Sequence, residues 1–382
     1  MAERRKEIME DIALASTCIG AVAERGEGKS LLLTLLTEVA KLAGDWHGIF
    51  VDTKGDDVAL DIPARGWQER ILRAKNLKPR GWNVQFYTFN FPYGLSNVPL
   101  KYTLAPIAMN MIGFGHLPYL SKILPGRDQK LFIDAYFDAG GPLAKLEDVI
   151  KYVLRKRKGK VSRLLLAMLT SGFFADESEI EPKRLLERLK TKDFIVIGSN
   201  FFDSSTEDLA RFATIVFIDA LKHYLRSAPI TQKLVVIFRE MGTIGPRSGT
   251  AGPGWHLGRR IEDFVRTARH VGFTITKVFW ESQSVADVPP SVLENSKIVF
   301  VHPNNLKAKG QVKKLEDYFP VPEEVKKRVG PMKDPGPGHF FILHKDGSWD
   351  YIFAPPPLSY RVKEPSAETP ERMRKEAEEV GG

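Results

Sequence analysis

The sequence predicts an α/β protein built on a parallel sheet that is interrupted by an all-helical insertion. Short apolar runs of strand length alternate with helical patterns near the start of the chain and again in its second half. The segment between these two parts has no strand-like run. Strands that alternate with helices indicate a parallel sheet with crossover helices. We therefore expect residues 1–98 and 191–360 to form the sheet domain, 99–190 the insertion and 361–382 a flexible charged tail.

The first part of the sheet is predicted from four short segments. Residues 17–22 have the composition of a buried strand, and residues 31–42 carry apolar side chains at helical spacing. Gly44 is placed to end that helix. Two further apolar runs, over 48–52 and 84–89, predict the next strands.

Strand patterns return after the Leu-, Ala- and Lys-rich insertion, together with a helical pattern over 206–224. Residues 215–219 imitate a strand that ends in an aspartate, but the helical stripe continues through them, so we interpret them as helix core. A closing hairpin is expected to turn at Asp346 and Gly347. The runs that predict strands in this half, the hairpin included, are 194–197, 233–238, 273–280, 298–301, 340–343 and 349–353.

The composition indicates a globular protein of a reducing compartment. The chain has 382 residues, 43% of them hydrophobic, and its single cysteine, Cys18, excludes an internal disulfide. The apolar run over 12–23 is shorter than the roughly 20 residues that span a bilayer, and the acidic residues before it are atypical of a secretory leader. We expect a cytoplasmic protein without a membrane span. Its net charge of +9 favours polyanionic partners.

A phosphate-binding loop is predicted between the first strand and the first helix. Residues 23–30 match the P-loop pattern of Gly, four residues and Gly-Lys-Ser, except that Ala23 replaces the first glycine. Backbone N–H groups of such a loop and of the helix after it bind phosphate oxygens. Lys29 is expected to reach the β- and γ-phosphates of ATP and Ser30 to bind Mg²⁺. The predicted nucleotide-binding residues are Glu24, Arg25, Gly26, Glu27, Gly28, Lys29, Ser30 and Leu31.

Four later segments make the chain resemble the HerA/FtsK superfamily of ring-forming DNA-translocating ATPases, which includes the coupling ATPases of type IV secretion. Residues 49–56 are similar to the family's apolar strand ending in Asp-Pro-Lys-Gly-Glu, and 266–273 to its Arg-Glu-Gly-Arg-Lys-Phe-Gly segment. Residues 281–289 resemble its Thr-Gln-Arg-Pro-Ser-Asp stretch, and 336–340 the Pro-Gly-Glu before its closing strands. The resemblance implies a RecA-like sheet with an additional strand, where the strand that bears Gln283 lies between the P-loop strand and the Walker B strand.

The resemblance also implies which carboxylates act on ATP. Residues 233–240 are similar to the Walker B strand, so Glu240 matches the catalytic glutamate that polarises water. Before it the family has an aspartate that supports Mg²⁺, and this chain has Arg239, which would repel the ion. Two outcomes are possible. Either Asp52 or Asp56 supports Mg²⁺ instead, with Asp52 as the predicted residue, or hydrolysis is impaired.

Three further residues complete the implied catalytic set. Gln283 is expected to act as a sensor that hydrogen-bonds the γ-phosphate or the attacking water. Arg269, with Arg266 as the alternative, is expected to enter the nucleotide site of an adjacent subunit, because a planar guanidinium suits phosphate charge. These arginine roles require a homo-oligomeric ring, and we expect a hexamer.

A run of basic side chains within 151–163 is the predicted contact with double-stranded DNA. It has no acidic residue, and such a run can follow a phosphate backbone without reading bases; a solvated helix end is the alternative interpretation. Its members are Lys151, Arg155, Lys156, Arg157, Lys158, Lys160 and Arg163. His223, His302 and His344 show no metal-ligand spacing and are expected to be structural.

The sequence therefore favours an ATP-driven motor that moves double-stranded DNA through a ring. Only about 16 residues precede the first strand, so we expect neither the N-terminal barrel of HerA nor the membrane helices of conjugation ATPases. Such a core fits a plasmid, mobile-element or viral packaging ATPase, or a subunit that works with a nuclease or a secretion partner. The alternative is an ATP-binding scaffold or regulatory subunit with little hydrolysis, as Ala23 and Arg239 would mark a degenerate site. A metabolite kinase is disfavoured, because kinases usually carry an arginine-rich lid.

Overall fold

The computed structural model describes most of the chain, in eight stretches. Within them, no helix is both long and apolar enough to cross a bilayer. The tail predicted over 361–382 falls outside these stretches from residue 362 onward. The described residues are 2–15, 17–90, 98–156, 161–199, 207–227, 232–241, 253–267 and 276–361.

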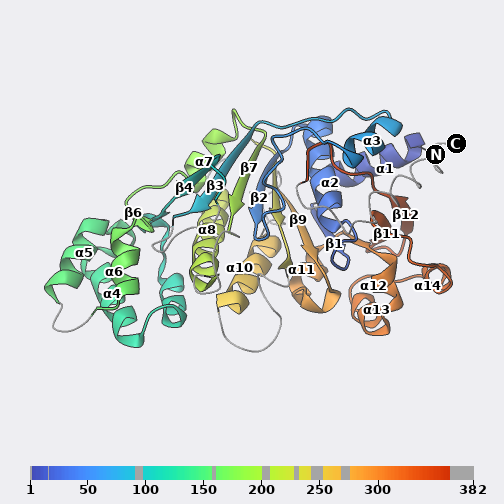
Figure 1. Cartoon of the computed structure of the whole chain (residues 1–382). Coiled ribbons are helices and arrows are strands. Elements are labelled where there is room, and N and C mark those ends of the chain that lie inside the picture. Colours follow the sequence, from blue (N-terminus) through green and yellow to red (C-terminus); the bar gives the residue numbers. More distant parts are fainter. Residues whose placement is uncertain are drawn as a thin grey trace.

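The described strands form a ten-stranded sheet, in the order β12-β11-β10-β1-β9-β8-β2-β7-β3-β4 (Figure 1). Neighbouring strands run parallel except that β11 is antiparallel to both β10 and β12, and β11 and β12 form the hairpin predicted at the end of the chain. β9 lies between β1 and β8, so the predicted place of the Gln283-bearing strand is confirmed. The strand bounds are β1 Cys18–Val22, β2 His47–Asp52, β3 Val84–Phe89, β4 Tyr102–Ala105, β7 Phe194–Gly198, β8 Leu234–Phe238, β9 Thr276–Ser282, β10 Ile298–Val301, β11 His339–His344 and β12 Trp349–Phe353.

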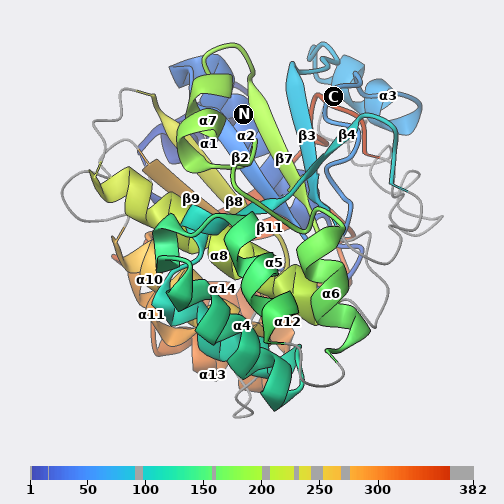
Figure 2. The same ribbon diagram turned by 90° about the vertical axis from the view of Figure 1, so that its left-hand side faces the viewer.

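Both faces of the sheet are buried, which explains the continuous apolar runs of its strands. Along β8, Val236 and Phe238 pack into one core, and Val235 and Ile237 pack into the other. Figures 1 and 2 show helices on each side of the sheet. On one side lie α1 (Ala2–Ala15), α2 (Lys29–Gly44) and α3 (Trp67–Ala74); on the other lie α8 (Glu207–Ser227), α10 (Pro253–Thr267) and α11 (Pro290–Asn295).

The insertion stands at one end of the molecule (Figure 1) and is not entirely helical, which corrects the prediction. β4 joins the edge of the main sheet, and β5 (Ile107–Ala108) pairs with β6 (Phe174–Ala175). Strands of two to four residues give too short an apolar pattern to be recognised. The helices here are η1 (Met109–Met111), η2 (Phe114–Lys122), α4 (Gly126–Asp138), η3 (Gly141–Leu143), α5 (Leu146–Arg155), α6 (Arg163–Thr170) and α7 (Pro182–Arg188).

The opposite end of the molecule carries short helices that follow β9 and β10. They are η4 (Val285–Asp287), α12 (Pro303–Lys307), α13 (Lys309–Glu316) and α14 (Glu323–Val329). Elsewhere α2 includes Gly44, and Asp45 caps its end in a left-handed conformation. Residues 215–219 lie within α8, so they are helix core as predicted. The N-terminal helix α1 was not predicted.

Candidate nucleotide-binding and catalytic site

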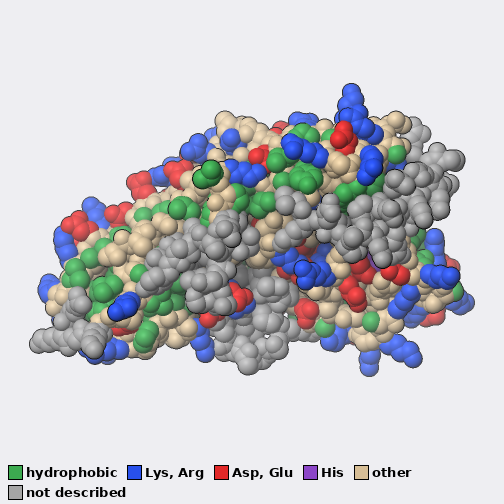
Figure 3. Space-filling view, viewed as in Figure 1, with side chains coloured by type: hydrophobic (Ala, Val, Ile, Leu, Met, Phe, Trp, Pro, Cys, Tyr) green, Lys and Arg blue, Asp and Glu red, His purple; other side chains and the backbone are tan. Residues whose placement is uncertain are grey.

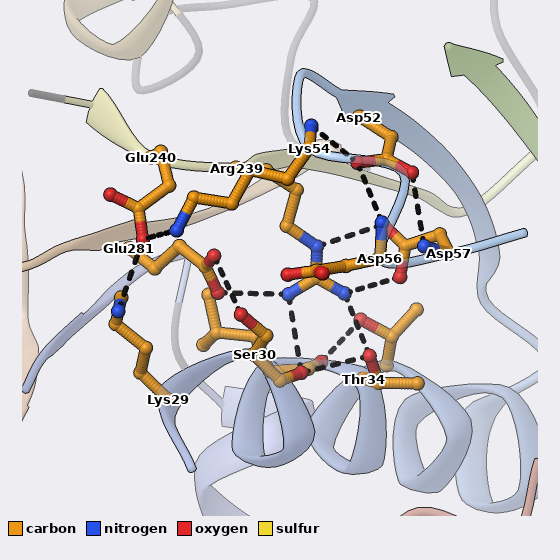
Figure 4. Close-up of polar contacts among 12 residues, drawn as sticks. Lys29, Ser30, Thr34, Asp52, Lys54, Asp56, Asp57, Arg239, Glu240 and Glu281 are labelled. Carbon is orange, nitrogen blue, oxygen red and sulfur yellow. Dashed lines mark hydrogen bonds and ion pairs between the residues drawn. The ribbon is translucent and has the colours of Figure 1, made fainter. Parts of the chain in front are cut away.

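The candidate site forms at the carboxyl ends of four adjacent parallel strands. In sheet order these are β1, β9, β8 and β2. The P-loop follows β1, Gln283 follows β9, Glu240 follows β8, and the 53–57 turn follows β2. Ligands of open parallel sheets bind at this edge. Figure 4 shows the side chains from these ends converging above the first turns of α2.

The P-loop has the backbone that phosphate binding requires. Gly26 and Gly28 adopt φ values of 90° and 92°, in the left-handed region that disfavours a side chain. A Cβ on Gly28 would also lie 3.0 Å from the backbone nitrogen of Gly338. Gly28 is the N-cap of α2 and offers no side-chain cap to the helix's first N–H groups. An N-terminus of this kind is suited to an anion.

Replacement of the first P-loop glycine is tolerated because Ala23 still belongs to the sheet. Its side chain is fully buried, and its N–H donates to the carbonyl of Ser282 at 3.2 Å. The strand pairing between β1 and β9 thus continues one residue into the loop. No positive φ is needed at this position, so the substitution is no sign of a degenerate loop.

Glu27 fixes the loop to its surroundings. Its carboxylate accepts from the N–H of Glu24 at 2.7 Å and lies 3.0 Å from Nδ1 of His302. The other ring nitrogen of His302 contacts the carbonyl of Gly336 at 2.9 Å, and the N–H of Gly338 donates to the Glu27 carbonyl at 3.0 Å. His302 and the glycine-rich segment before β11 therefore both support the P-loop.

Glu240 is the carboxylate at the centre of the site. It is 1% exposed, and its Oε1 lies 3.0 Å from Nζ of Lys29 and also pairs with Lys54. Nε2 of Gln283 donates to its Oε2 at 3.1 Å. The structure therefore brings together three predicted residues, Lys29, Glu240 and Gln283. Lys54 was not predicted as a partner of Glu240.

Two features keep Glu240 oriented and ionised. Its φ of 52° is a left-handed value that is uncommon outside glycine, and such strain gathers at functional sites. Burial opposes ionisation, but Lys29 and Lys54 outweigh it and hold the pKa of Glu240 below its ordinary value. The site thus presents a buried carboxylate that carries charge at neutral pH.

Arg239 points away from Glu240, into a buried ion cluster beside α2 (Figure 4). Its Nε and Nη2 donate to the two carboxylate oxygens of Asp57 at 2.8 and 2.7 Å. Its Nη1 donates to Oε2 of Glu281 at 3.0 Å, and Nη2 also donates to Thr34 at 2.7 Å. Arg239, Asp57 and Glu281 are all fully buried. The guanidinium is thus held by two carboxylates instead of facing a metal site directly.

The hydroxyl of Ser30 donates to Oε1 of Glu281 at 2.8 Å. Asp52 is the residue predicted to support the metal. Its carboxylate accepts four hydrogen bonds, at 2.8–3.2 Å, from the backbone N–H groups of residues 54–57. Burial, together with Asp57 and Asp56, raises its pKa to about 6. Its oxygens close the turn after β2, and support of the metal by Asp52 stays a prediction.

The described end of the chain also reaches this cluster. Arg361 is 4% exposed and pairs with Asp57, and it lies 3.6 Å from Asp56. Just before it, Leu358 and Ser359 bind the carboxylate of Glu38 on α2. No sequence motif marks these residues, because they meet α2 only through the fold.

The remaining predicted arginines and lysines that the structure describes lie on helices α5, α6 and α10 or directly after α5. Arg266, on α10, is exposed and pairs with Asp263 at 2.8 Å, and Arg269 lies outside the described residues. Lys151 and Arg155 on α5, with Lys156 after it and Arg163 on α6, are exposed at the far end of the insertion. Arg157, Lys158 and Lys160 lie outside the described residues. On the face in Figure 3, described Lys and Arg side chains are spread along the molecule and mixed with acidic ones.

A parallel sheet with a glycine-rich loop between β1 and α2, and a carboxylate at the end of a nearby strand, is the fold of P-loop nucleoside triphosphatases. No family model matches the chain, and no curated protein matches it.

Among solved structures, the chain is similar to the genome packaging NTPase B204 of Sulfolobus turreted icosahedral virus 2, in complex with ATP-gammaS. Identity is 12%, the TM-score is 0.39, and 89% of this chain and 98% of that chain are covered. The bacterial conjugative coupling protein TrwB, without its first 70 residues, has 13% identity and a TM-score of 0.46, with 91% and 87% covered. The pCW3 conjugation coupling protein TcpA, with ATPgS, has 10% identity and a TM-score of 0.33, with 96% and 66% covered. The function proposed below rests on the residues of this chain.

Proposed function

We propose that the protein is an ATP-hydrolysing, ring-forming motor that moves double-stranded DNA. The proposal of ATP hydrolysis rests on one observation, the contact of Glu240 with both Lys29 and Gln283. A phosphate-binding lysine, a carboxylate and a neutral amide meet at one point, which is what positioning of water beside a γ-phosphate requires.

The reaction assigned to these residues is hydrolysis of the terminal phosphoanhydride. Water oxygen bonds to the γ-phosphorus, and the bond from that phosphorus to the β–γ bridging oxygen breaks with its electron pair leaving on ADP. Glu240 takes the proton of the water, and Gln283 orients the water or a γ-phosphate oxygen. Lys29 leaves Glu240 for the phosphates when ATP binds, and Lys54 then remains as the cation paired with Oε1 of Glu240.

The site also suits a magnesium ion. The Ser30 hydroxyl, on the first turn of α2, is the residue that would hold it, and the polar atom beside that hydroxyl is a carboxylate oxygen. Oxygen donors of this kind are the ligands that Mg²⁺ prefers. When bound with ATP, Mg²⁺ would neutralise charge on the β- and γ-phosphates.

Two parts of the proposal, binding of DNA and formation of a ring, rest on the sequence. The resemblance of the motifs implies a ring whose arginines act between subunits, and the exposed side chains of Lys151, Arg155, Lys156 and Arg163 supply a polyanion contact. The test is a phosphate-release assay with and without duplex DNA, combined with mass measurement in an ATP analogue. DNA-stimulated release by an oligomer supports the motor. Nucleotide binding without release, at every DNA concentration, would instead identify the scaffold.

A further inference from the structure

We propose that Glu281 is the positioning carboxylate of the magnesium site, in place of an aspartate at position 239. It accepts a hydrogen bond from the Ser30 hydroxyl and so orients that hydroxyl toward the ion. This inference rests on the proposed function, because it concerns the metal that accompanies ATP.

The strand order brings Glu281 to Ser30. β9 is the direct neighbour of β1, and Glu281 pairs in register with Ala21, near the end of β1. The P-loop then returns the chain to the same edge at the start of α2, where Ser30 Oγ donates to Glu281 Oε1 at 2.8 Å. A carboxylate that binds a metal-ligating group fixes its orientation and raises its basicity.

The two carboxylate oxygens of Glu281 have different partners, so each side of the carboxylate is held by a different residue. Oε2 accepts from Nη1 of Arg239 at 3.0 Å, and Oε1 accepts from Ser30. A fully buried carboxylate without a cation would be costly to ionise. Arg239 supplies the cation that pairs with Glu281 and fixes the plane of its carboxylate, so Arg239 supports the site.

Arg239 is itself held on the side away from Glu281. Asp57 binds its guanidinium with two hydrogen bonds, and Thr34 binds it with a third. Nη1 of Arg239 also donates to the backbone carbonyl of Ser30 at 3.2 Å, so the guanidinium cannot turn toward the Ser30 hydroxyl without breaking buried contacts. The strand that bears Glu240 thus supplies a cation where the Walker B pattern has an aspartate, and the neighbouring strand β9 supplies the carboxylate.

The test compares Glu281→Gln with Asp57→Asn. Each removes one carboxylate charge that pairs with Arg239, but only Glu281 also contacts Ser30. Two affinities are measured for the full-length protein: that of ATPγS in EDTA, and that of Mn²⁺ for the protein–ATPγS complex by electron paramagnetic resonance. Thermal unfolding shows that each variant is folded.

Glu281→Gln should weaken Mn²⁺ binding by about tenfold to a hundredfold, the usual effect of removing a group that orients a metal ligand. It should leave ATPγS binding in EDTA unchanged, and Asp57→Asn should keep the wild-type Mn²⁺ affinity. Because Glu281 acts through Ser30, Ser30→Ala combined with Glu281→Gln should bind Mn²⁺ no more weakly than Ser30→Ala alone. If Glu281→Gln does not fold, the double variant Arg239→Gln and Glu281→Gln, which removes both charges, is measured instead. It should show the same loss of Mn²⁺ affinity.

Two results would overturn the inference: equal losses of Mn²⁺ affinity in the Glu281 and Asp57 variants, or additive effects of the Ser30 and Glu281 substitutions. Failure of the proposed function looks different. In that case the wild-type protein itself binds no ATPγS, with or without a divalent ion, and Lys29→Ala changes nothing.

Discussion

Arg239 and Asp57 form a bidentate ion pair beside α2, with N···O distances of 2.8 and 2.7 Å, and both side chains are fully buried. Asp57 follows β2 and Arg239 follows β8, so the pair ties together the ends of two adjacent strands. Arg239 also donates to Glu281 and to the Ser30 carbonyl, so this guanidinium joins the two strand ends to β9 and to the first turn of α2.

The first prediction concerns this pair. Arg239→Met leaves Glu281 without its buried cation and Asp57 with Arg361 alone, and breaking such a pair typically costs about 3–5 kcal/mol. Arg239→Lys should recover only part of the loss, since an ammonium cannot bind a carboxylate with a planar fork. The free energy of unfolding in urea is the measurement. As a control, Arg73→Ala breaks an exposed pair with Glu69 and should cost about 1 kcal/mol or less. A loss at position 239 no larger than this would contradict the prediction.

Much of the sheet was predictable because its strands are buried on both faces. Runs such as those of β3 and β10 have the bounds predicted from the sequence. Short elements were missed where the pattern is brief, as in β4, of which only the two end residues are buried. The helix α1 was missed because its apolar residues gather in its second half and its first turns are charged, so no apolar stripe runs along its whole length.

Residues of the candidate site could be predicted only where a sequence pattern marks them. Lys29 and Ser30 belong to the eight residues of the P-loop pattern, and Glu240 and Gln283 follow recognisable strands. The partner of Ser30 is 251 positions away, and a pattern does not give the direction of a side chain. Arg239 was therefore predicted to disturb the metal, although its guanidinium is turned into the ion cluster.

The second prediction is a pH dependence of stability that arises from Glu38. This carboxylate is fully buried in α2, and burial raises its pKa to about 7, although hydrogen bonds from Ser359, Leu358 and Trp82 act in the opposite direction. The unfolded chain releases this proton near its ordinary pKa of 4.5. Between these values the folded state binds the extra proton, so stability should fall as pH rises from about 4.5 to 7, by about 3 kcal/mol in all.

Comparison with Glu38→Gln isolates this contribution. The variant loses some hydrogen bonds at every pH, but it cannot titrate at this position. The difference in free energy of unfolding between wild type and variant should therefore change over this pH range and be constant outside it. Asp52, whose pKa is also raised, titrates in both proteins and cancels in the difference. A difference that is independent of pH would contradict the assignment.

The third prediction tests the DNA contact. Replacing the exposed Lys151, Arg155 and Arg163 with glutamine should weaken binding of duplex DNA. It should also lower the slope of log K against log salt by about 0.9 for each DNA phosphate that the protein no longer neutralises. Fluorescence anisotropy of a labelled duplex at several salt concentrations is the measurement. The matched control changes three other exposed cations to glutamine, at the opposite end of the molecule: Lys313, Lys314 and Lys327. Equal slopes for the two triple variants would show that the basic run has no special role.

The fourth prediction separates binding of ATP from its hydrolysis. Lys29→Ala removes the cation that would hold the phosphates and should abolish binding of ATPγS. Glu240→Gln keeps the size of the side chain and a carbonyl oxygen for Lys29, but an amide cannot accept the proton of the attacking water. Binding should therefore persist while turnover falls by roughly 10²–10⁴-fold, the usual contribution of a general base. Glu69→Gln, which changes an exposed carboxylate on α3, should leave both unchanged. Phosphate release and equilibrium binding are measured on the same preparations, and wild-type turnover in Glu240→Gln would exclude Glu240 as the base.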